Sequence, residues 1–152
     1  MAAPNPQTRG MDAWHRLIRF MGQVQAELEA HLLEISGLRP PDWDVIAQLG
    51  RADAPLVMSD LADRLAFKPT RLSNRVRRLE EAGLVERLTN EADARSTLLR
   101  LTRKGRGLLE KARPAHRAWI AERFAGRLSA EELGQLEKCL RALTDSDAGG
   151  AE

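Results

Sequence analysis

The densest cluster of chemically active side chains in this sequence is a run of positive residues between positions 68 and 78. It holds five basic side chains: Lys68, Arg71, Arg75, Arg77 and Arg78. No acid accompanies them before Glu80. Positive residues four apart on a helix, such as Arg71 and Arg75, repel each other by roughly a few tenths of a kcal/mol. A polyanion would supply the missing negative charge, so the run predicts a surface that binds nucleic acid.

A second candidate lies in the polar stretch 89–96, where Asp93 and Arg95 flank Ala94. An arginine at the tip of a hairpin can enter a narrow minor groove, where the electrostatic potential is most negative. Asp93 can either pair with the guanidinium of Arg95 or bond backbone N–H groups of the loop. An Asp93–Arg95 ion pair without any function would have the same sequence. The loop is therefore interpreted as a DNA-binding wing only because it follows a helix-turn-helix.

The elements that must position these side chains follow from the spacing of the apolar residues. Helices are expected over residues 11–36, 40–50, 59–65, 70–82, 102–125 and 129–143, and strands over 56–58, 84–88 and 97–101. Gly37 and Gly83 end the first and fourth helices, and Pro114 should kink or divide the fifth. The short third helix, a turn and the basic fourth helix match a helix-turn-helix, and the hairpin that follows becomes its wing.

Polar residues at the starts of four helices are expected to act as N-caps, because their side chains can accept from unpaired backbone N–H groups. These residues are Ser59, Thr70, Thr102 and Ser129. Ser129 and Glu132 also have the spacing of a capping box, in which each residue bonds the backbone of the other.

A helical wheel at about 100° per residue divides the fourth helix into two faces. Leu72, Val76 and Leu79 define the buried side. The candidate DNA-contacting residues lie on or beside the opposite side: Lys68, Thr70, Arg71, Ser73, Asn74, Arg77 and Arg78. Arginine can bond two acceptors on guanine, asparagine can pair with adenine, and the hydroxyl side chains can hold phosphates. Arg75 lies nearest the buried edge, which favours a structural or phosphate-facing role over direct reading of bases.

Motifs in the middle of the chain carry a resemblance to a known family. They are residues 59–65 (SDLADRL), 72–87 (LSNRVRRLEEAGLVER), 93–95 (DAR) and 101–105 (LTRKG). On these motifs the chain resembles the MarR family of bacterial transcriptional regulators, over about residues 14–143. The family commonly has Thr-Arg where Ser73-Asn74 stands, so Asn74 is a departure that leaves the base preference open.

The resemblance implies a mainly α-helical winged helix-turn-helix protein with a small β-hairpin wing, which binds a palindromic operator as a homodimer. A repressor is expected, and an activator is the alternative. Residues 40–101 would form the DNA-binding lobe, and 11–37 with 102–144 the helical dimerisation region. Residues 1–10 and the acidic segment 145–152 are expected to be flexible ends. Heptad-like apolar stripes in both terminal regions agree with a dimer, although such a stripe also suits the core of a single subunit.

Many members of this family bind small aromatic or phenolic ligands between the dimerisation helices and the DNA-binding lobe. That property makes His31, Arg39 and Trp43 candidate pocket residues, although Trp43 also suits a core position and His31 an interface position. Cys139 is interpreted as a buried, inert thiol. The three histidines lack metal-ligand spacing, and neither a metal nor a cofactor is expected.

Composition narrows the remaining classes of protein. The chain has 152 residues with 24 Lys and Arg against 22 Asp and Glu, a net charge of +2. A single cysteine excludes an internal disulfide framework, and no apolar run approaches the roughly 20 residues of a membrane helix. These features predict a cytoplasmic protein, and the family resemblance implies a bacterial one that is associated with the nucleoid through DNA binding.

Two other functions compete with DNA binding. An enzyme is not expected, because the sequence lacks a Gly-rich phosphate loop, a nucleophile elbow and a His-Glu-x-x-His zinc motif. A winged-helix module that binds another protein, without specific DNA binding, is the remaining alternative. The unopposed arginines favour DNA over this alternative.

Overall fold

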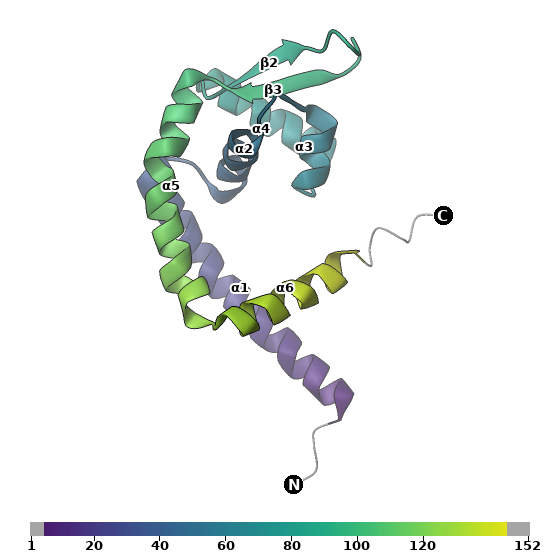
Figure 1. The fold of residues 1–152 in the computed structure, drawn as a ribbon, viewed down its shortest axis with the longest axis vertical. Coiled ribbons are helices and arrows are strands. Elements are labelled where there is room, and N and C mark those ends of the chain that lie inside the picture. Colours follow the sequence, from purple (N-terminus) through teal and green to yellow (C-terminus); the bar gives the residue numbers. More distant parts are fainter. Residues whose placement is uncertain (1–4, 146–152) are drawn as a thin grey trace, which may run out of the picture. The chain divides into compact units, whose positions relative to one another are not determined.

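The computed structural model describes residues 5–145. Its elements, in chain order, are α1 (Pro6–Ser36), α2 (Pro40–Arg51), β1 (Leu56–Val57), α3 (Met58–Arg64), α4 (Pro69–Glu81), β2 (Val85–Thr89), β3 (Thr97–Leu101), α5 (Arg103–Arg123), a 3-10 turn (Ala125–Arg127) and α6 (Ala130–Asp145) (Figure 1). The chain forms two compact units, which divide within α5 between Ala112 and Arg113. Among the described residues, no helix combines the length and apolarity needed to cross a membrane.

The first helix is longer than its apolar spacing predicts. It begins at Pro6 rather than at residue 11, because the side chain of Asn5 accepts a hydrogen bond from the backbone N–H of Gln7 at 3.1 Å and so caps the start. Residues 6–10, predicted to belong to a flexible end, are therefore helical. Asp145, the first residue of the predicted acidic tail, is the last residue of α6. Residues 1–4 and 146–152 lie outside the described residues. Gly37 ends the helix in the left-handed conformation, with φ of 71°.

Two of the four predicted N-caps are wrong. The N-caps of α3 and α4 are Val57 and Lys68, and neither makes a side-chain capping bond, so Ser59 and Thr70 lie inside the helices. In α4 a proline occupies the first turn, where its fixed φ suits the helix and its missing N–H costs no bond.

The other two predicted caps are confirmed. The backbone N–H of Gly105 donates to the Thr102 hydroxyl at 3.0 Å. Glu132 donates its backbone N–H to the Ser129 hydroxyl at 3.2 Å, and its carboxylate accepts from the Ser129 backbone N–H at 2.8 Å. This reciprocal pair is the predicted capping box at the start of α6.

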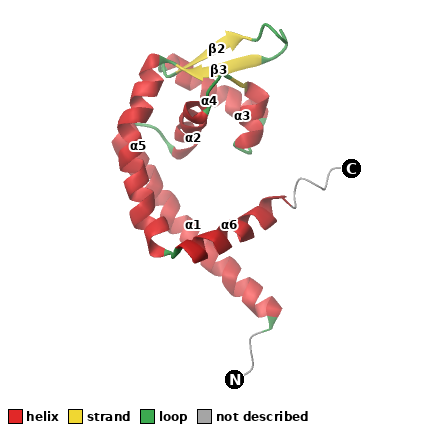
Figure 2. Ribbon diagram, in the orientation of Figure 1, coloured by secondary structure: helices red, strands yellow, loops and turns green. Residues whose placement is uncertain are grey.

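The wing is a twisted antiparallel sheet with strand order β1-β3-β2, drawn in yellow in Figure 2. Val85 pairs with Leu101 at the base of the β2–β3 hairpin, and Thr89 pairs with Thr97 near its tip. Leu56 of β1 pairs with Leu99, so β3 is the central strand. The predicted hairpin is confirmed, and β1 is the expected short strand.

A tight junction fixes the base of the hairpin to the start of α5. Gly83 ends α4 with φ of 71°, and its carbonyl accepts from the Thr102 hydroxyl at 2.6 Å. A Cβ atom on Gly105 would lie 2.0 Å from the carbonyl oxygen of Leu84. Only glycine permits this approach of α5 to the hairpin, so this junction helps to set the direction in which the wing leaves the helices.

The core of the first unit lies among α2, α3, α4 and the sheet, and Leu32 of α1 and Leu109 and Ala112 of α5 also belong to it. Its fully buried large side chains are Leu32, Ile46, Leu61, Leu72, Leu99, Val45, Val76 and Val85. The N-terminal half of α1 behaves differently, since it projects away from these helices in Figure 1. Its apolar side chains remain exposed, among them Trp14 at 57%, Ile18 at 46% and Met21 at 53%.

The second unit corrects two expectations. The alternative that Pro114 divides the fifth helix is wrong, because α5 runs from Arg103 to Arg123 with Pro114 inside it. Cys139 on α6 is exposed rather than buried. The reason is that the described chain leaves the apolar residues of α6 themselves exposed, Leu140 at 45% and Leu143 at 66%.

Candidate nucleic-acid interface

Helix α4 separates an apolar face from a basic one, as the helical wheel predicts. Leu72 and Val76 are fully buried and Leu79 is 3% exposed, which fixes the rotation of the helix about its axis. The side chains of the predicted contact residues are all exposed: Lys68, Thr70, Arg71, Ser73, Asn74, Arg77 and Arg78. Burial of the three apolar side chains therefore presents the basic run as a continuous surface.

Part of this surface is concave. A hollow of about 360 Å³ is lined by Lys68, Thr70, Arg71, Asn74, Arg75 and Arg78. Four of these six side chains carry a positive charge, so the hollow is suited to an anion. Ser73 and Arg77 are exposed on the same helix but do not line the hollow.

The basic residues on this surface differ in how strongly they are already engaged. Within residues 5–145, neither Lys68 nor Arg71 forms an ion pair, and the Asn74 amide makes no hydrogen bond. Arg77 lies 3.8 Å from Glu81, and both side chains are more than 60% exposed, so this pair contributes little to stability. These side chains are consequently available to a nucleic acid.

Arg75 is engaged on the inner side of the helix. Its guanidinium donates to the Asp42 carboxylate of α2 at 2.8 Å, and the two side chains are only 18% and 17% exposed. The predicted position of Arg75 at the buried edge is thus confirmed. Burial also raises the pKa of Asp44, while the positive charges of Arg51 and Arg75 act in the opposite direction.

Sequence reasoning missed the partner of Arg75. Asp42 precedes it by 33 residues, and it looks like an ordinary acid in the first turn of a helix. No spacing rule connects the start of α2 with the middle of α4, because only the packed fold brings them together. Asp42 also lies 3.6 Å from Arg78, so one carboxylate faces two arginines of α4.

The wing loop has its own hydrogen-bond frame. The Asp93 carboxylate accepts from the backbone N–H of Arg95 at 3.0 Å, and the Asn90 amide donates to the Ser96 hydroxyl at 2.7 Å. Among the described residues, none forms an ion pair with the Arg95 guanidinium, which is exposed at the tip. Of the two roles predicted for Asp93, the structure therefore supports the one in which it orders the loop backbone.

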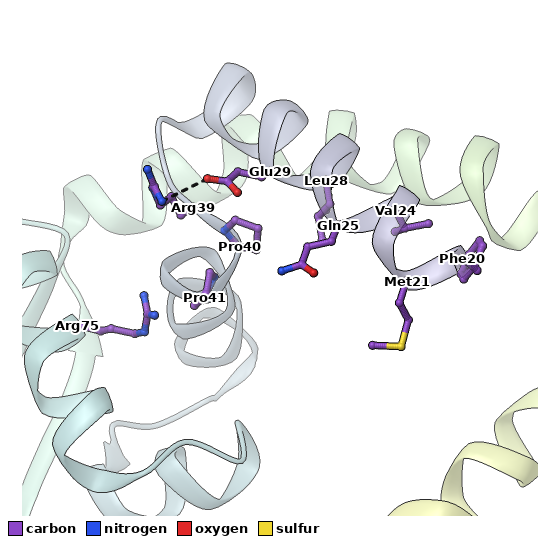
Figure 3. A pocket seen from close by; sticks show the side chains of 10 residues that line it. All are labelled: Phe20, Met21, Val24, Gln25, Leu28, Glu29, Arg39, Pro40, Pro41 and Arg75. Atoms are coloured by element: carbon purple, nitrogen blue, oxygen red, sulfur yellow. Dashed lines mark ion pairs between the residues drawn. The ribbon is translucent and has the colours of Figure 1, made fainter. Parts of the chain in front are cut away.

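A second hollow, of about 550 Å³, lies between α1 and the start of α2 (Figure 3). Its apolar wall comes from α1 and from two prolines of α2: Phe20, Met21, Val24, Leu28, Pro40 and Pro41. Arg39 and Arg75 lie toward one end of it in Figure 3, and Arg39 is 3.4 Å from Glu29. The hollow therefore combines an apolar wall with two arginines, Arg39 and Arg75, each paired to a carboxylate, and with the carboxylate of Glu29.

Of the three predicted pocket residues, one lines this hollow and two do not. Arg39 lines it, whereas His31 does not. Trp43 is 4% exposed and belongs to the core. Sequence reasoning did not identify Met21, Gln25 or the two prolines, since ordinary apolar and polar residues give no signal of a pocket before the fold is known.

Arg75 is the one residue that lines both hollows within residues 5–145. The hollow on the basic surface of α4 and the hollow beside α1 therefore share the Arg75 side chain.

Comparison with known proteins shows to which family this chain belongs. A sequence model of the MarR family matches residues 36–96, from the end of α1 to the wing loop. An uncharacterised HTH-type transcriptional regulator from Bacillus cereus is 31% identical over 125 residues, which cover 82% of this chain and 82% of the relative. The chain belongs to the MarR family. An HTH-type transcriptional repressor from Mycobacterium tuberculosis, also similar, is 29% identical over 127 residues and covers 84% of this chain and 89% of that protein.

Solved structures agree with the assignment to the MarR family. AbsC, a MarR-family regulator from Streptomyces coelicolor, superposes with a TM-score of 0.88 at 27% identity, over 98% of this chain and 99% of AbsC. Sco3205 from the same organism, solved in complex with DNA, has a TM-score of 0.88 at 23% identity, over 95% and 91% of the two chains.

CouR from Rhodococcus jostii, solved with bound p-coumaroyl-CoA, has a TM-score of 0.77 at 25% identity, over 87% of this chain and 91% of CouR. The predicted winged helix-turn-helix fold is thus confirmed. This MarR-family chain is a transcriptional regulator, and it is not an enzyme.

Proposed function

We propose that this MarR-family regulator represses transcription by binding a palindromic operator as a homodimer. The observation that carries the proposal is the exposed face of α4, where Lys68, Arg71 and Asn74 lack intramolecular partners among the described residues. Unpaired cations on one helix face, beside a hairpin with an exposed arginine at its tip, supply both kinds of contact that DNA recognition needs. The DNA complex of Sco3205, which has the same fold, supports this use of the surface.

In this proposal α4 enters the major groove and the wing follows the backbone into the adjacent minor groove. Asn74 would read adenine, and Arg71 or Arg77 would read guanine through its two adjacent acceptors. Lys68, at the start of the helix, would hold a phosphate together with nearby backbone N–H groups. Arg95 would enter the minor groove at the wing tip.

The homodimer rests on the exposed apolar side chains of the terminal helices. In the first unit, the N-terminal half of α1 exposes Trp14, Ile18 and Met21. In the second unit, α6 exposes Leu140 and Leu143 beside a groove of about 710 Å³. Monomeric soluble proteins rarely expose contiguous apolar faces of this kind, so a second copy is the partner we propose. A two-fold dimer presents its two α4 helices to half-sites about 34–36 Å apart.

Repression is the finer part of the proposal. The similar protein from Mycobacterium tuberculosis is named a repressor, and a dimer that covers an operator across a promoter excludes polymerase by occupancy alone. A reporter gene behind the operator should fall in expression when the regulator is supplied. Increased expression would show an activator instead.

The hollow of Figure 3 is the proposed site for a small aromatic or phenolic effector. Its apolar wall suits a ring, and Arg39 suits a carboxylate or phenolate. CouR, with p-coumaroyl-CoA bound, is a similar protein that holds a ligand of this chemistry. A panel of aromatic carboxylates, headed by p-coumarate, should raise the melting temperature of the wild type, and the panel should lose this effect in Arg39→Ala.

Selection of duplexes from a random pool tests the main proposal. The enriched sequences should contain an inverted repeat with half-sites about one helical turn apart, and binding to them should weaken steeply with salt because each neutralised phosphate releases counterions. A pool that yields no sequence bound better than random DNA would refute sequence-specific recognition. A stable protein complex found in its place would favour the protein-binding alternative.

A further inference from the structure

One carboxylate links the core of the DNA-binding lobe to its basic helix. Asp42 lies in the first turn of α2, and the next residue, Trp43, is 4% exposed in the core. The Asp42 carboxylate accepts from Arg75 at 2.8 Å and lies 3.6 Å from Arg78. Asp42 is therefore anchored on a buried helix and faces two arginines of α4.

The second partner of Arg75 comes from the turn before α4. The guanidinium carbon of Arg75 lies 5.6 Å from the centre of the Phe67 ring, a cation–π distance. Phe67 is itself held, because its backbone N–H donates to the Ala62 carbonyl of α3 at 2.9 Å. The preceding residue, Ala66, has φ of 51°, a conformation that non-glycine residues seldom adopt. Arg75 thus joins α2, the turn and α4 at one point.

We propose that Asp42 is a positioning residue for DNA binding, which acts through Arg75 to fix α4 at the angle and depth that the major groove requires. The inference rests on the proposed function. In this role Arg75 makes no contact with DNA, since its guanidinium is turned toward the Asp42 carboxylate at 2.8 Å and its side chain is only 18% exposed. Arg78 is 58% exposed and lies farther from Asp42, at 3.6 Å, so it stays available to the DNA phosphates.

Two roles of Asp42 can be distinguished: it can hold α4 in place through Arg75, or it can act on DNA only through its negative charge. Asp42 is an acid beside a DNA-binding surface, so if it acted only through its charge, its removal would strengthen DNA binding. If Asp42 instead holds α4 through Arg75, its removal weakens binding despite the gain of positive charge. The two roles therefore predict changes of opposite sign.

The test measures affinity for the selected operator duplex over a range of salt concentrations. Asp42→Ala and Arg75→Gln should each weaken binding about tenfold, and the double variant should be no weaker than either single variant, because both changes break the same link. The slope of affinity against salt should equal that of the wild type, since no phosphate contact is lost. Asp42→Asn, which retains an acceptor for Arg75, should lose less than Asp42→Ala.

Glu110→Ala supplies the matched control. Glu110 is an exposed acid of α5, so its removal makes the same change in net charge away from α4, and binding should equal or slightly exceed that of the wild type. Thermal melts monitored by circular dichroism establish that every variant is folded at the assay temperature. In an Arg78→Gln background, Asp42→Ala should still weaken binding about tenfold, because Arg75 remains its target.

Three results would overturn the inference. One is an Asp42→Ala variant that binds as tightly as Glu110→Ala. Another is an Arg75→Gln variant whose salt slope falls by about one, which would make Arg75 a direct phosphate contact. The third is an effect of Asp42→Ala that disappears in the Arg78→Gln background, which would mean that Asp42 acts only on Arg78. If the wild type binds no duplex specifically, the proposed function fails instead.

Discussion

Gly105 lies so close to the carbonyl oxygen of Leu84 that a Cβ atom on it would be 2.0 Å away. The carbonyl belongs to the start of the hairpin and the glycine to the first turn of α5, and both are main-chain positions that cannot rotate aside. This contact, together with the Thr102 hydroxyl bonded to the Gly83 carbonyl, fixes the base of the wing against the start of α5.

Replacement of Gly105 by alanine should destabilise the protein by about 1–3 kcal/mol or more, because the backbone must move to admit a methyl group. Gly107, on the same helix, has nothing within 4 Å of its hypothetical Cβ. Gly107→Ala should therefore stabilise the helix by up to about 1 kcal/mol. Urea unfolding measures both free energies, and equal effects of the two substitutions would contradict the steric explanation.

Arg95→Ala should weaken operator binding about tenfold and lower the salt slope by about one, because it removes an exposed cation that no residue of 5–145 pairs. Asp93→Ala should also weaken binding while leaving the salt slope unchanged, since Asp93 orders the loop through the Arg95 backbone N–H. Arg106→Ala, an exposed arginine of α5, is the charge-matched control. Loss of affinity in that control equal to the loss in Arg95→Ala would indicate a general charge effect.

Asn74 and Lys68 should differ in what they contribute to DNA binding. Asn74→Ala should relax the base preference at one position in each half-site, with a loss of about 1–3 kcal/mol of discrimination. Lys68→Ala should weaken binding to all duplexes alike, because a phosphate contact carries no sequence information. Repeated selection with each variant measures both effects. An unchanged consensus with Asn74→Ala would remove Asn74 from the set of base-reading residues and leave Arg71 and Arg77 as the candidates.

Leu17→Glu should convert the proposed dimer to a monomer, since it places a charge within the exposed apolar stripe of α1, where Leu17 is 36% exposed. Gln23→Glu introduces the same charge on the opposite side of the helix and should leave the dimer intact. Sedimentation equilibrium gives the mass of each variant. A wild type that sediments as a monomer at micromolar concentration would refute the proposed assembly.

The capping box of α6 predicts a dependence of stability on pH. Hydrogen bonds from the Ser129 backbone N–H and hydroxyl lower the pKa of Glu132 below its usual value of 4.5. The folded state thus prefers the carboxylate, and this stabilisation is present above pH 4.5 and is lost as the pH falls through the lower, folded value. Glu132→Gln should lower the melting temperature at pH 7, and the difference from the wild type should shrink below pH 4.5.

Glu131 provides the control for this effect. It is an exposed acid of the same helical turn, which accepts from the Gln135 amide at 3.2 Å. Glu131→Gln should show a smaller difference from the wild type at pH 7. A difference for Glu132→Gln that stays constant from pH 7 to pH 3.5 would exclude the proposed ionic contribution.

Local patterns were sufficient for most of the fold. The buried face of α4 was predictable because Leu72, Val76 and Leu79 repeat with the period of the helix, and the caps at Thr102 and Ser129 were predictable because their partners lie three residues away. The predicted caps at Ser59 and Thr70 failed since nearby residues, Val57 and Lys68, already stand at the helix boundary. Capping residues identify a helix start only to within a turn.

The features of the candidate sites also separate into those that follow from local spacing and those that depend on packing between distant segments. Exposure of the basic residues of α4 follows from the wheel, and so does the position of Arg75 at the buried edge. Its link to Asp42 depends on packing between segments 33 residues apart, and the hollow beside α1 depends on how α2 leaves that helix. Of the two positions expected for Trp43, pocket and core, the structure shows the core, where the side chain is 4% exposed.

The sharing of Arg75 between the two hollows restricts how this protein can be redesigned as a biosensor. A library aimed at new small molecules can vary Met21, Val24 and Gln25, which line the hollow beside α1 and lie far along the chain from α4. If the hollow beside α1 holds the proposed effector, a change at Arg75 would alter the dose response and the promoter output together, and a screen on reporter signal would confuse altered ligand preference with altered DNA affinity. The useful design space is therefore the α1 wall, with Arg75 and Asp42 held constant.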